Sequence, residues 1–93
     1  MLPMKALQRG QRVQVSETYH WARGALGRIS EPPEAVRALS NDWTGCFRLV
    51  KTQQGLFAFY WVEFDERHRD SDGDGPYASA EIDGRYLIPV STA

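Results

Sequence analysis

The residues with the clearest chemical potential form an acidic loop in the last third of the chain. Aspartates stand at positions 70, 72 and 74, Gly75 follows, and Glu81 comes after five further residues. This spacing matches the calcium-loop pattern D-x-[DN]-x-[DN]-G-x5-E, in which carboxylates supply hard oxygen ligands and the glycine permits a sharp turn. The pattern makes Asp70, Asp72, Asp74 and Glu81 candidate calcium ligands, with Glu81 closing the site through both oxygens.

The residues around this loop favour a second interpretation. The run before Asp70 has the pattern of a strand rather than of an entering helix, and Ile82-Asp83-Gly84 does not suggest an exiting helix. Aspartate and glycine are also the usual residues of a solvated turn. We therefore expect a turn without a cofactor, and calcium binding in a structural role stays open as the alternative.

The other reactive side chains do not form a recognisable catalytic pattern. Cys46 is the single cysteine, so the chain cannot form an internal disulfide, and the two histidines are His20 and His68. No Cys/His spacing typical of zinc, no nucleophile with an orienting base and no phosphate-binding loop is present. His20 lies between Tyr19 and Trp21, which predicts an aromatic cluster in a loop. The sequence predicts a protein that is not an enzyme.

Short strands separated by Gly-rich turns must position these residues. Alternation around Val13 and Val15 predicts a first strand over residues 11–16, and residues 17–23 form a long polar and aromatic loop. Further strands are expected at residues 24–29, 45–52, 56–65 and 86–90, with a turn or short strand at 77–82. Pro33 opens a short helix near residues 33–40, whose Val36 and Leu39 should face inward.

The strongest strand, residues 56–65, carries aromatic side chains on both faces. Side chains alternate across a strand, so Glu63 and Asp65 mark the outer face, and Leu56, Ala58, Tyr60, Val62 and Phe64 form the core face. Phe57, Phe59 and Trp61 then lie on the outer face. Either they form an exposed patch for a partner, or a bulge reverses the alternation or the segment 30–42 covers them.

These elements predict an all-β domain, a small five-stranded SH3-like barrel with the helical insertion near residues 33–40. The length of 93 residues suits one domain, residues 1–93, with residues 1–8 as a flexible N-terminus. A barrel also avoids the exposed edges of a short open sheet.

A family resemblance points to the same fold. The paired valines Val13 and Val15 and the sequence Gly24-x-x-Gly27-x-Ile29 resemble the opening of KOW-type SH3-like barrels. Arg9-Gly10, the stretch 17–21, the strand residues 62–65 and the later segment 80–87 resemble photosystem I subunit IV and other electron-transport accessory barrels. The resemblance implies binding rather than catalysis: KOW-type barrels often bind RNA or ribosomal proteins, and accessory barrels dock onto a larger complex.

The charge distribution bears on the kind of partner. Residues 1–60 carry eight basic and four acidic side chains, residues 61–93 carry three basic and eight acidic ones, and the whole chain has a net charge of −1. The acidic second half opposes phosphate approach over part of the surface, which favours a protein partner over RNA. RNA stays open, because Arg9, Arg12, Arg23, Arg28 and Arg48 are interleaved with aromatic residues.

We therefore expect a cytoplasmic accessory module that docks onto a protein partner or a larger complex. No apolar stretch of signal or membrane-spanning length occurs, so no membrane is expected. Aromatic side chains and arginine are enriched at binding hot spots. The predicted contact residues are Tyr19, His20, Trp21, Arg23, Trp43, Phe57, Phe59 and Trp61.

Overall fold

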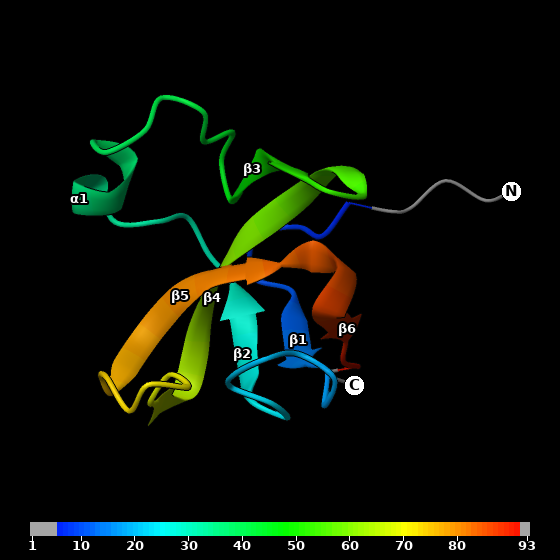
Figure 1. Ribbon diagram of the computed structural model, residues 1–93, viewed down its shortest axis with the longest axis vertical. Helices are drawn as coiled ribbons and strands as arrows, with labels where there is room; N and C mark the ends of the chain where they lie inside the picture. Colours follow the sequence, from blue (N-terminus) through cyan, green and yellow to red (C-terminus); the bar gives the residue numbers. More distant parts are fainter. Residues whose placement is uncertain (1–5, 92–93) are drawn as a thin grey trace, which may run out of the picture.

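The computed structural model describes residues 6–91, which form one curled antiparallel sheet in the shape of a half-barrel (Figure 1). Its strands are β1 (Arg12–Val15), β2 (Leu26–Ile29), β3 (Phe47–Thr52), β4 (Gly55–His68), β5 (Tyr77–Asp83) and β6 (Leu87–Pro89). A short helix α1 (Glu34–Arg37) and a 3₁₀ turn η1 (Gly84–Tyr86) complete the fold. The predicted all-β small barrel is confirmed, and the segment 77–82, expected as a turn or short strand, is a full strand.

The long strand β4 organises the sheet. The sheet order is β3-β4-β2-β1-β6, and β5 pairs with β4 as well. β3 and β2 meet successive parts of β4, with Phe47 opposite Tyr60 and Ile29 opposite Val62. β5 pairs with β4 from Phe59 to His68, with a register shift after Glu63. Because β4 contacts three strands, its two faces decide what is core and what is surface.

The core lies on the predicted face of β4. Tyr60, Val62 and Phe64 are buried together with Val13 and Val15 of β1. Leu56 was expected on the same face, but it is 63% exposed. The β3–β4 hairpin extends beyond the part of β4 that pairs with β2, so β2 does not reach this end of the face. The alternation was correct, and the core simply ends before Leu56.

The helix α1 forms inside the predicted segment but buries little. Pro33 precedes its first turn, and the backbone N–H of Ala38 donates to the Glu34 carbonyl. Figure 1 shows α1 standing away from the sheet. Val36 is half-buried and Leu39 is 86% exposed, so the prediction that Leu39 faces inward was wrong. A helix of four residues that stands off the sheet has no core against which to pack Leu39.

The end of the chain before β1 is partly described. Residues 1–5 of the predicted flexible segment 1–8 lie outside the described residues, whereas Leu7 packs against the core and its amide donates to the Tyr60 hydroxyl at 3.1 Å. Within residues 6–91, no helix has the length and apolar character needed to cross a membrane.

Candidate interaction site

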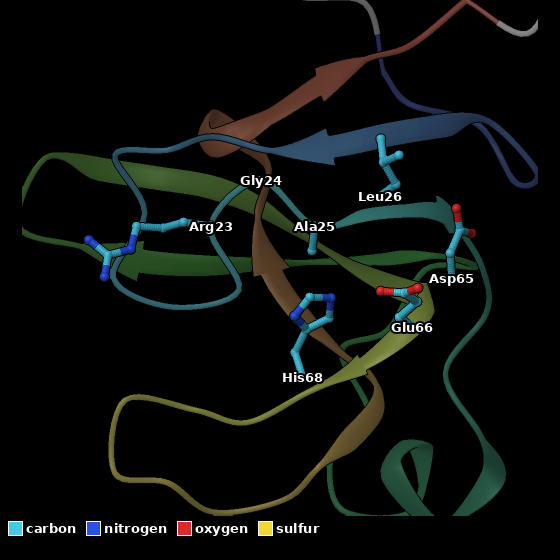
Figure 2. Close-up of a pocket in the computed structure, with 7 residues that line it drawn as sticks. All are labelled: Arg23, Gly24, Ala25, Leu26, Asp65, Glu66 and His68. Atoms are coloured by element: carbon cyan, nitrogen blue, oxygen red, sulfur yellow. The ribbon is translucent and has the colours of Figure 1, made fainter.

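A cleft runs between the first long loop and the loop that joins β4 to β5. We call it the loop cleft; it consists of three open hollows of about 320, 390 and 360 Å³. Arg23 and His68 line both the first and the second hollow, and His20 and Asp70 line both the second and the third. Figure 2 shows the first hollow, where Arg23 on the loop and His68 at the end of β4 lie on facing segments.

Trp21 lines the loop cleft and is held in place by two aromatic side chains. Its ring meets Phe64 edge-on with 5.8 Å between ring centroids and Tyr77 with 6.0 Å, while the side chain stays half-buried. His20 beside it is exposed, and its ring tilts against Tyr19 at 4.4 Å, which confirms the predicted aromatic cluster. Trp21 is therefore anchored to the core and still reachable from solvent.

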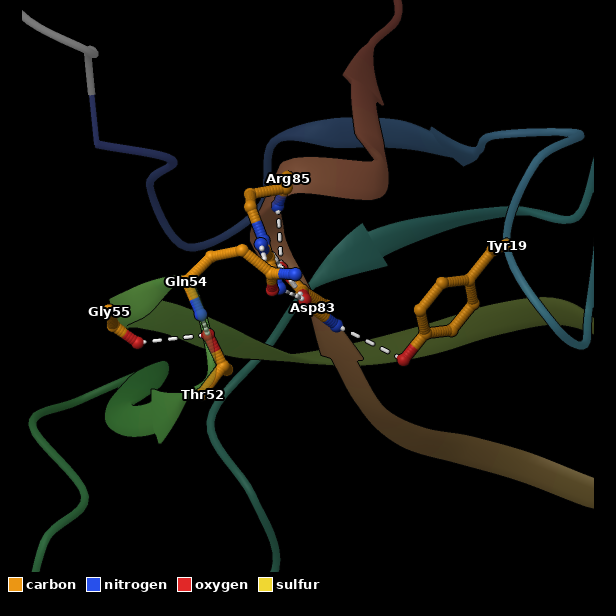
Figure 3. Close-up of polar contacts among 6 residues, drawn as sticks. All are labelled: Tyr19, Thr52, Gln54, Gly55, Asp83 and Arg85. Carbon is orange, nitrogen blue, oxygen red and sulfur yellow. Dashed lines mark hydrogen bonds and ion pairs between the residues drawn. The ribbon is translucent and has the colours of Figure 1, made fainter.

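Tyr19 was predicted as a contact residue, but the structure buries it. Its side chain is 8% exposed and belongs to the core cluster. The phenol oxygen accepts the backbone N–H of Asp83 at 3.4 Å (Figure 3), which ties the first loop to the end of β5. Tyr19 therefore fixes the loop that carries His20 and Trp21 and offers no surface of its own.

Burial also gives Tyr19 a predicted alkaline signature. Desolvation raises the pKa of its phenol above the usual range because the phenolate is disfavoured inside the core. The folded state then holds this proton more tightly than the unfolded state. The contribution of Tyr19 to the free energy of unfolding is therefore fully present below the pKa of the unfolded state and declines as the pH rises above it. We expect urea midpoints measured from about pH 8 to about pH 11 to fall for the wild type and less for Tyr19→Phe. Identical declines would contradict this role.

Two rings of the outer aromatic row of β4 are covered, one by arginine and one by tryptophan. Phe57, Phe59 and Trp61 are half-buried. The guanidinium carbon of Arg85 lies 3.8 Å from the ring centroid of Phe57, and Trp43 meets Trp61 edge-on at 6.1 Å. The ladder is regular along this row, so no bulge reverses the alternation. Phe57 and Trp61 are thus covered by Arg85 and Trp43, which lie outside the segment 30–42.

An ion pair crosses the same face above β4. Arg48 stands opposite Phe59, and Glu81 stands opposite Trp61 on the other side of the strand. The guanidinium of Arg48 donates to both oxygens of Glu81, with Nη2 to Oε1 at 3.1 Å, and also reaches Asp42 at 3.3 Å. The hydrogen bond that Arg48 donates to the Glu81 carboxylate raises the pKa of Arg48 above its ordinary value. Glu81 is therefore engaged across the sheet.

The sheet separates the predicted contact residues into two groups. Phe64 and Trp61 lie on opposite faces of β4 because their positions differ by an odd number. Trp21 packs on Phe64 and Trp43 packs on Trp61, so His20, Trp21 and Arg23 lie apart from the outer row. The predicted contact residues therefore do not form one continuous surface, because their aromatic partners lie on different faces of β4.

The acidic loop brings together three of the four predicted calcium ligands. Carboxylate oxygens of Asp70, Asp72 and Asp74 lie within 4.8 Å of one another, and the group found among the described residues does not include Glu81. Asp70 Oδ1 accepts the backbone N–H groups of Asp72 at 3.0 Å and Asp74 at 2.9 Å. Because Glu81 binds Arg48 instead, the predicted bidentate closure is not assembled.

This arrangement predicts a weak response to calcium. Three aspartates without the closing glutamate, one of them already accepting two backbone bonds, offer fewer oxygens than the six to eight that calcium usually takes. We expect roughly millimolar calcium to leave the amide NMR resonances of Gly73, Gly75 and Glu81 unshifted relative to chelator-treated protein. Saturable shifts confined to these residues would show that the loop binds the ion and that Glu81 leaves Arg48.

A third surface was not foreseen from the sequence. A groove of about 500 Å³ lies under the β3–β4 hairpin and is mostly apolar, with Leu7, Phe47, Leu56 and Leu87 in its lining. The sequence could have indicated this groove only through Leu56. Recognising that Leu56 is exposed requires knowing where β2 ends. In the loop cleft, Tyr77 was likewise missed, because only the fold brings the β4–β5 loop back to Trp21.

Fold and site define a small all-β domain with a cleft between two loops at one end of a curled sheet. The chain finds no match among protein-family models, curated proteins or solved structures.

Proposed function

We propose that this domain is a non-catalytic interaction module that docks onto a protein partner or a larger complex through the loop cleft. The observation that carries the proposal is the setting of Trp21, which is held by Phe64 and Tyr77 and lies half-buried between two hollows that it lines. A tryptophan fixed in this way adds contact area at little cost in side-chain entropy, as binding hot spots do.

The thiol chemistry supports binding rather than catalysis. Cys46 is buried, and desolvation raises the pKa of its thiol, which is the direction opposite to that of an activated nucleophile. The resemblance to accessory barrels, which dock onto larger complexes, agrees with this function.

The arginines favour a protein partner over RNA. Of the five arginines that suggested a phosphate-binding surface, Arg9 pairs with Glu31, Arg12 with Asp65 and Arg28 with Glu63. Arg48 pairs with Glu81. Arg23 alone of the five has no carboxylate partner among the ion pairs of residues 6–91. Paired arginines offer little to phosphates, so an RNA module of the KOW type is the weaker candidate.

Co-purification of tagged domain with its native complexes tests the proposal. We expect Trp21→Ala to keep the fold, checked by amide NMR dispersion, and to lose the associated protein. Trp43→Ala is the matched control, because Trp43 lies on the other face of β4, and it should retain the protein. The proposal would be contradicted if Trp43→Ala lost the associated protein while Trp21→Ala retained it. It would also be contradicted if the wild type recovered only nucleic acid.

A further inference from the structure

The free edge of β5 runs beside the third hollow of the loop cleft. The backbone N–H of Trp61 donates to the Cys46 carbonyl at 2.9 Å, and its carbonyl accepts the N–H of Ser30 at 3.0 Å. Both groups therefore point away from β5, and Glu81, which stands opposite Trp61, must direct its own N–H and C=O outward. The same alternation directs Ser79 outward, while the outward N–H of Asp83 reaches Tyr19.

This edge is available for another strand. Within residues 6–91, the outward backbone groups of Ser79 and Glu81 have no hydrogen-bond partner, since β5 pairs with β4 only. A row of unpaired N–H and C=O groups is a template for an added strand. Ser79 and Glu81 direct their backbone N–H and C=O groups outward, and Ala80 between them directs its groups toward β4. This alternation is the spacing of an antiparallel ladder.

The hollow beside this edge supplies a place for a side chain. Ala80 lies between Ser79 and Glu81 and lines the hollow together with Trp21 and Tyr77. A strand added to β5 would place the residue opposite Ala80 on the same face of the sheet, over the hollow. Backbone bonds at the edge and a pocket for alternate side chains are the two features of recognition by strand addition.

The charges around the hollow select the kind of side chain. Asp70 and Asp72 line it, and neither takes part in an ion pair within the described residues. The neighbouring Arg69 donates to the carbonyl oxygens of Gly73 and Gly75. Aromatic faces attract cations, tryptophan most strongly. Two aromatic walls with carboxylates at the rim complement a lysine or arginine side chain.

We propose that the partner contributes an extended basic segment, which adds to the edge of β5 as a strand and places a lysine or arginine in the third hollow, against Trp21 and Tyr77. The carboxylates of Asp70 and Asp72 neutralise that side chain from the rim. This inference rests on the proposed function, since it names the chemistry of the partner that docks in the loop cleft.

A pair of synthetic peptides tests the inference. The probe is a capped pentapeptide of alternating threonine and valine with arginine at its centre, and the control carries glutamine there. Titrated into isotope-labelled domain, the arginine peptide should shift the amides of Ser79 and Glu81 and the indole N–H of Trp21. We expect it to bind about tenfold more tightly than the glutamine peptide and to weaken with added salt.

Two variants and one modified peptide sharpen the result. Asp72→Asn should remove most of the advantage of arginine over glutamine, whereas Asp74→Asn, which lies outside the lining of the hollow, should keep it. Methylating the peptide amides that face β5 should abolish binding. Equal binding of the two peptides, shifts at the β3 edge around Leu49 instead of β5, or no shifts at all would overturn the inference. If native complexes still depend on Trp21 while the arginine peptide fails, the inference falls and the proposed function stands.

Discussion

Asp83→Ala should lower the free energy of unfolding by about 2–3 kcal/mol, because it removes a buried carboxylate that accepts hydrogen bonds from the backbone and the side chain of Arg85. The side chain of Asp83 is only 5% exposed, and its Oδ2 accepts from Arg85 Nη2 at 2.6 Å. Its Oδ1 also accepts the backbone N–H of Arg85 at 2.9 Å, which holds the turn from β5 into η1 (Figure 3). Urea unfolding followed by tryptophan fluorescence measures the loss.

The ion pair connects this turn to the β3–β4 hairpin. Arg85 stacks on Phe57, and its Nη1 reaches the side-chain oxygen of Gln54 at 3.4 Å. The hairpin turn itself is closed by Thr52, whose hydroxyl donates to the Gly55 carbonyl and accepts the amide of Gln54. Removing Asp83 therefore loosens the cover of the outer aromatic row as well as the turn.

Two controls separate this effect from the loss of any surface charge. Asp83→Asn keeps an oxygen for the Arg85 amide and should cost less than Asp83→Ala. Glu31→Ala removes an exposed carboxylate that accepts from Arg9 and Arg37, and exposed pairs of this kind contribute little to stability. A loss from Asp83→Ala no larger than that from Glu31→Ala would refute the structural role of the buried Asp83 carboxylate.

Ile82→Ala should have an effect of similar size, about 3 kcal/mol, through the cavity that it leaves in the core. Ile82 is 0% exposed and stands opposite Tyr60 in the ladder between β4 and β5. Ile88→Ala is the matched control, because Ile88 of β6 is 49% exposed and stands opposite Gln14 of β1. We expect it to cost less than about 1 kcal/mol. Equal losses in urea unfolding would mean that the core does not lie on the inner face of β5.

The parts of the fold that follow from local patterns were predictable. The period-two pattern of β4 identified its core face from Tyr60 to Phe64, and Pro33 marked the start of α1. Where the prediction was wrong, the deciding contact was not local. Leu39 is exposed because α1 stands off the sheet, and Leu56 is exposed because β2 ends before reaching it. A sequence pattern says which residues share a face but not how far the cover extends.

The candidate site followed from the sequence only in part. Trp21 and His20 were identified from residue type, and the structure places both at the loop cleft. Glu81 fitted a ligand spacing, yet it pairs with Arg48, which lies 33 positions away in the chain. That competition is decided by strand pairing, because Arg48 and Glu81 flank the same segment of β4. The contact between Tyr77 and Trp21 likewise depends on the fold, which brings the β4–β5 loop back to Trp21.

Photo-crosslinking in cells tests the central claim most directly, namely that a protein docks at the loop cleft. A photoreactive amino acid would replace the exposed His20 in one variant and the exposed Leu39 of the distant α1 segment in a second. We expect a protein adduct of defined mass from position 20 and none from position 39. An adduct from position 39 alone, or an adduct at position 20 that contains nucleic acid in place of protein, would contradict the proposed function.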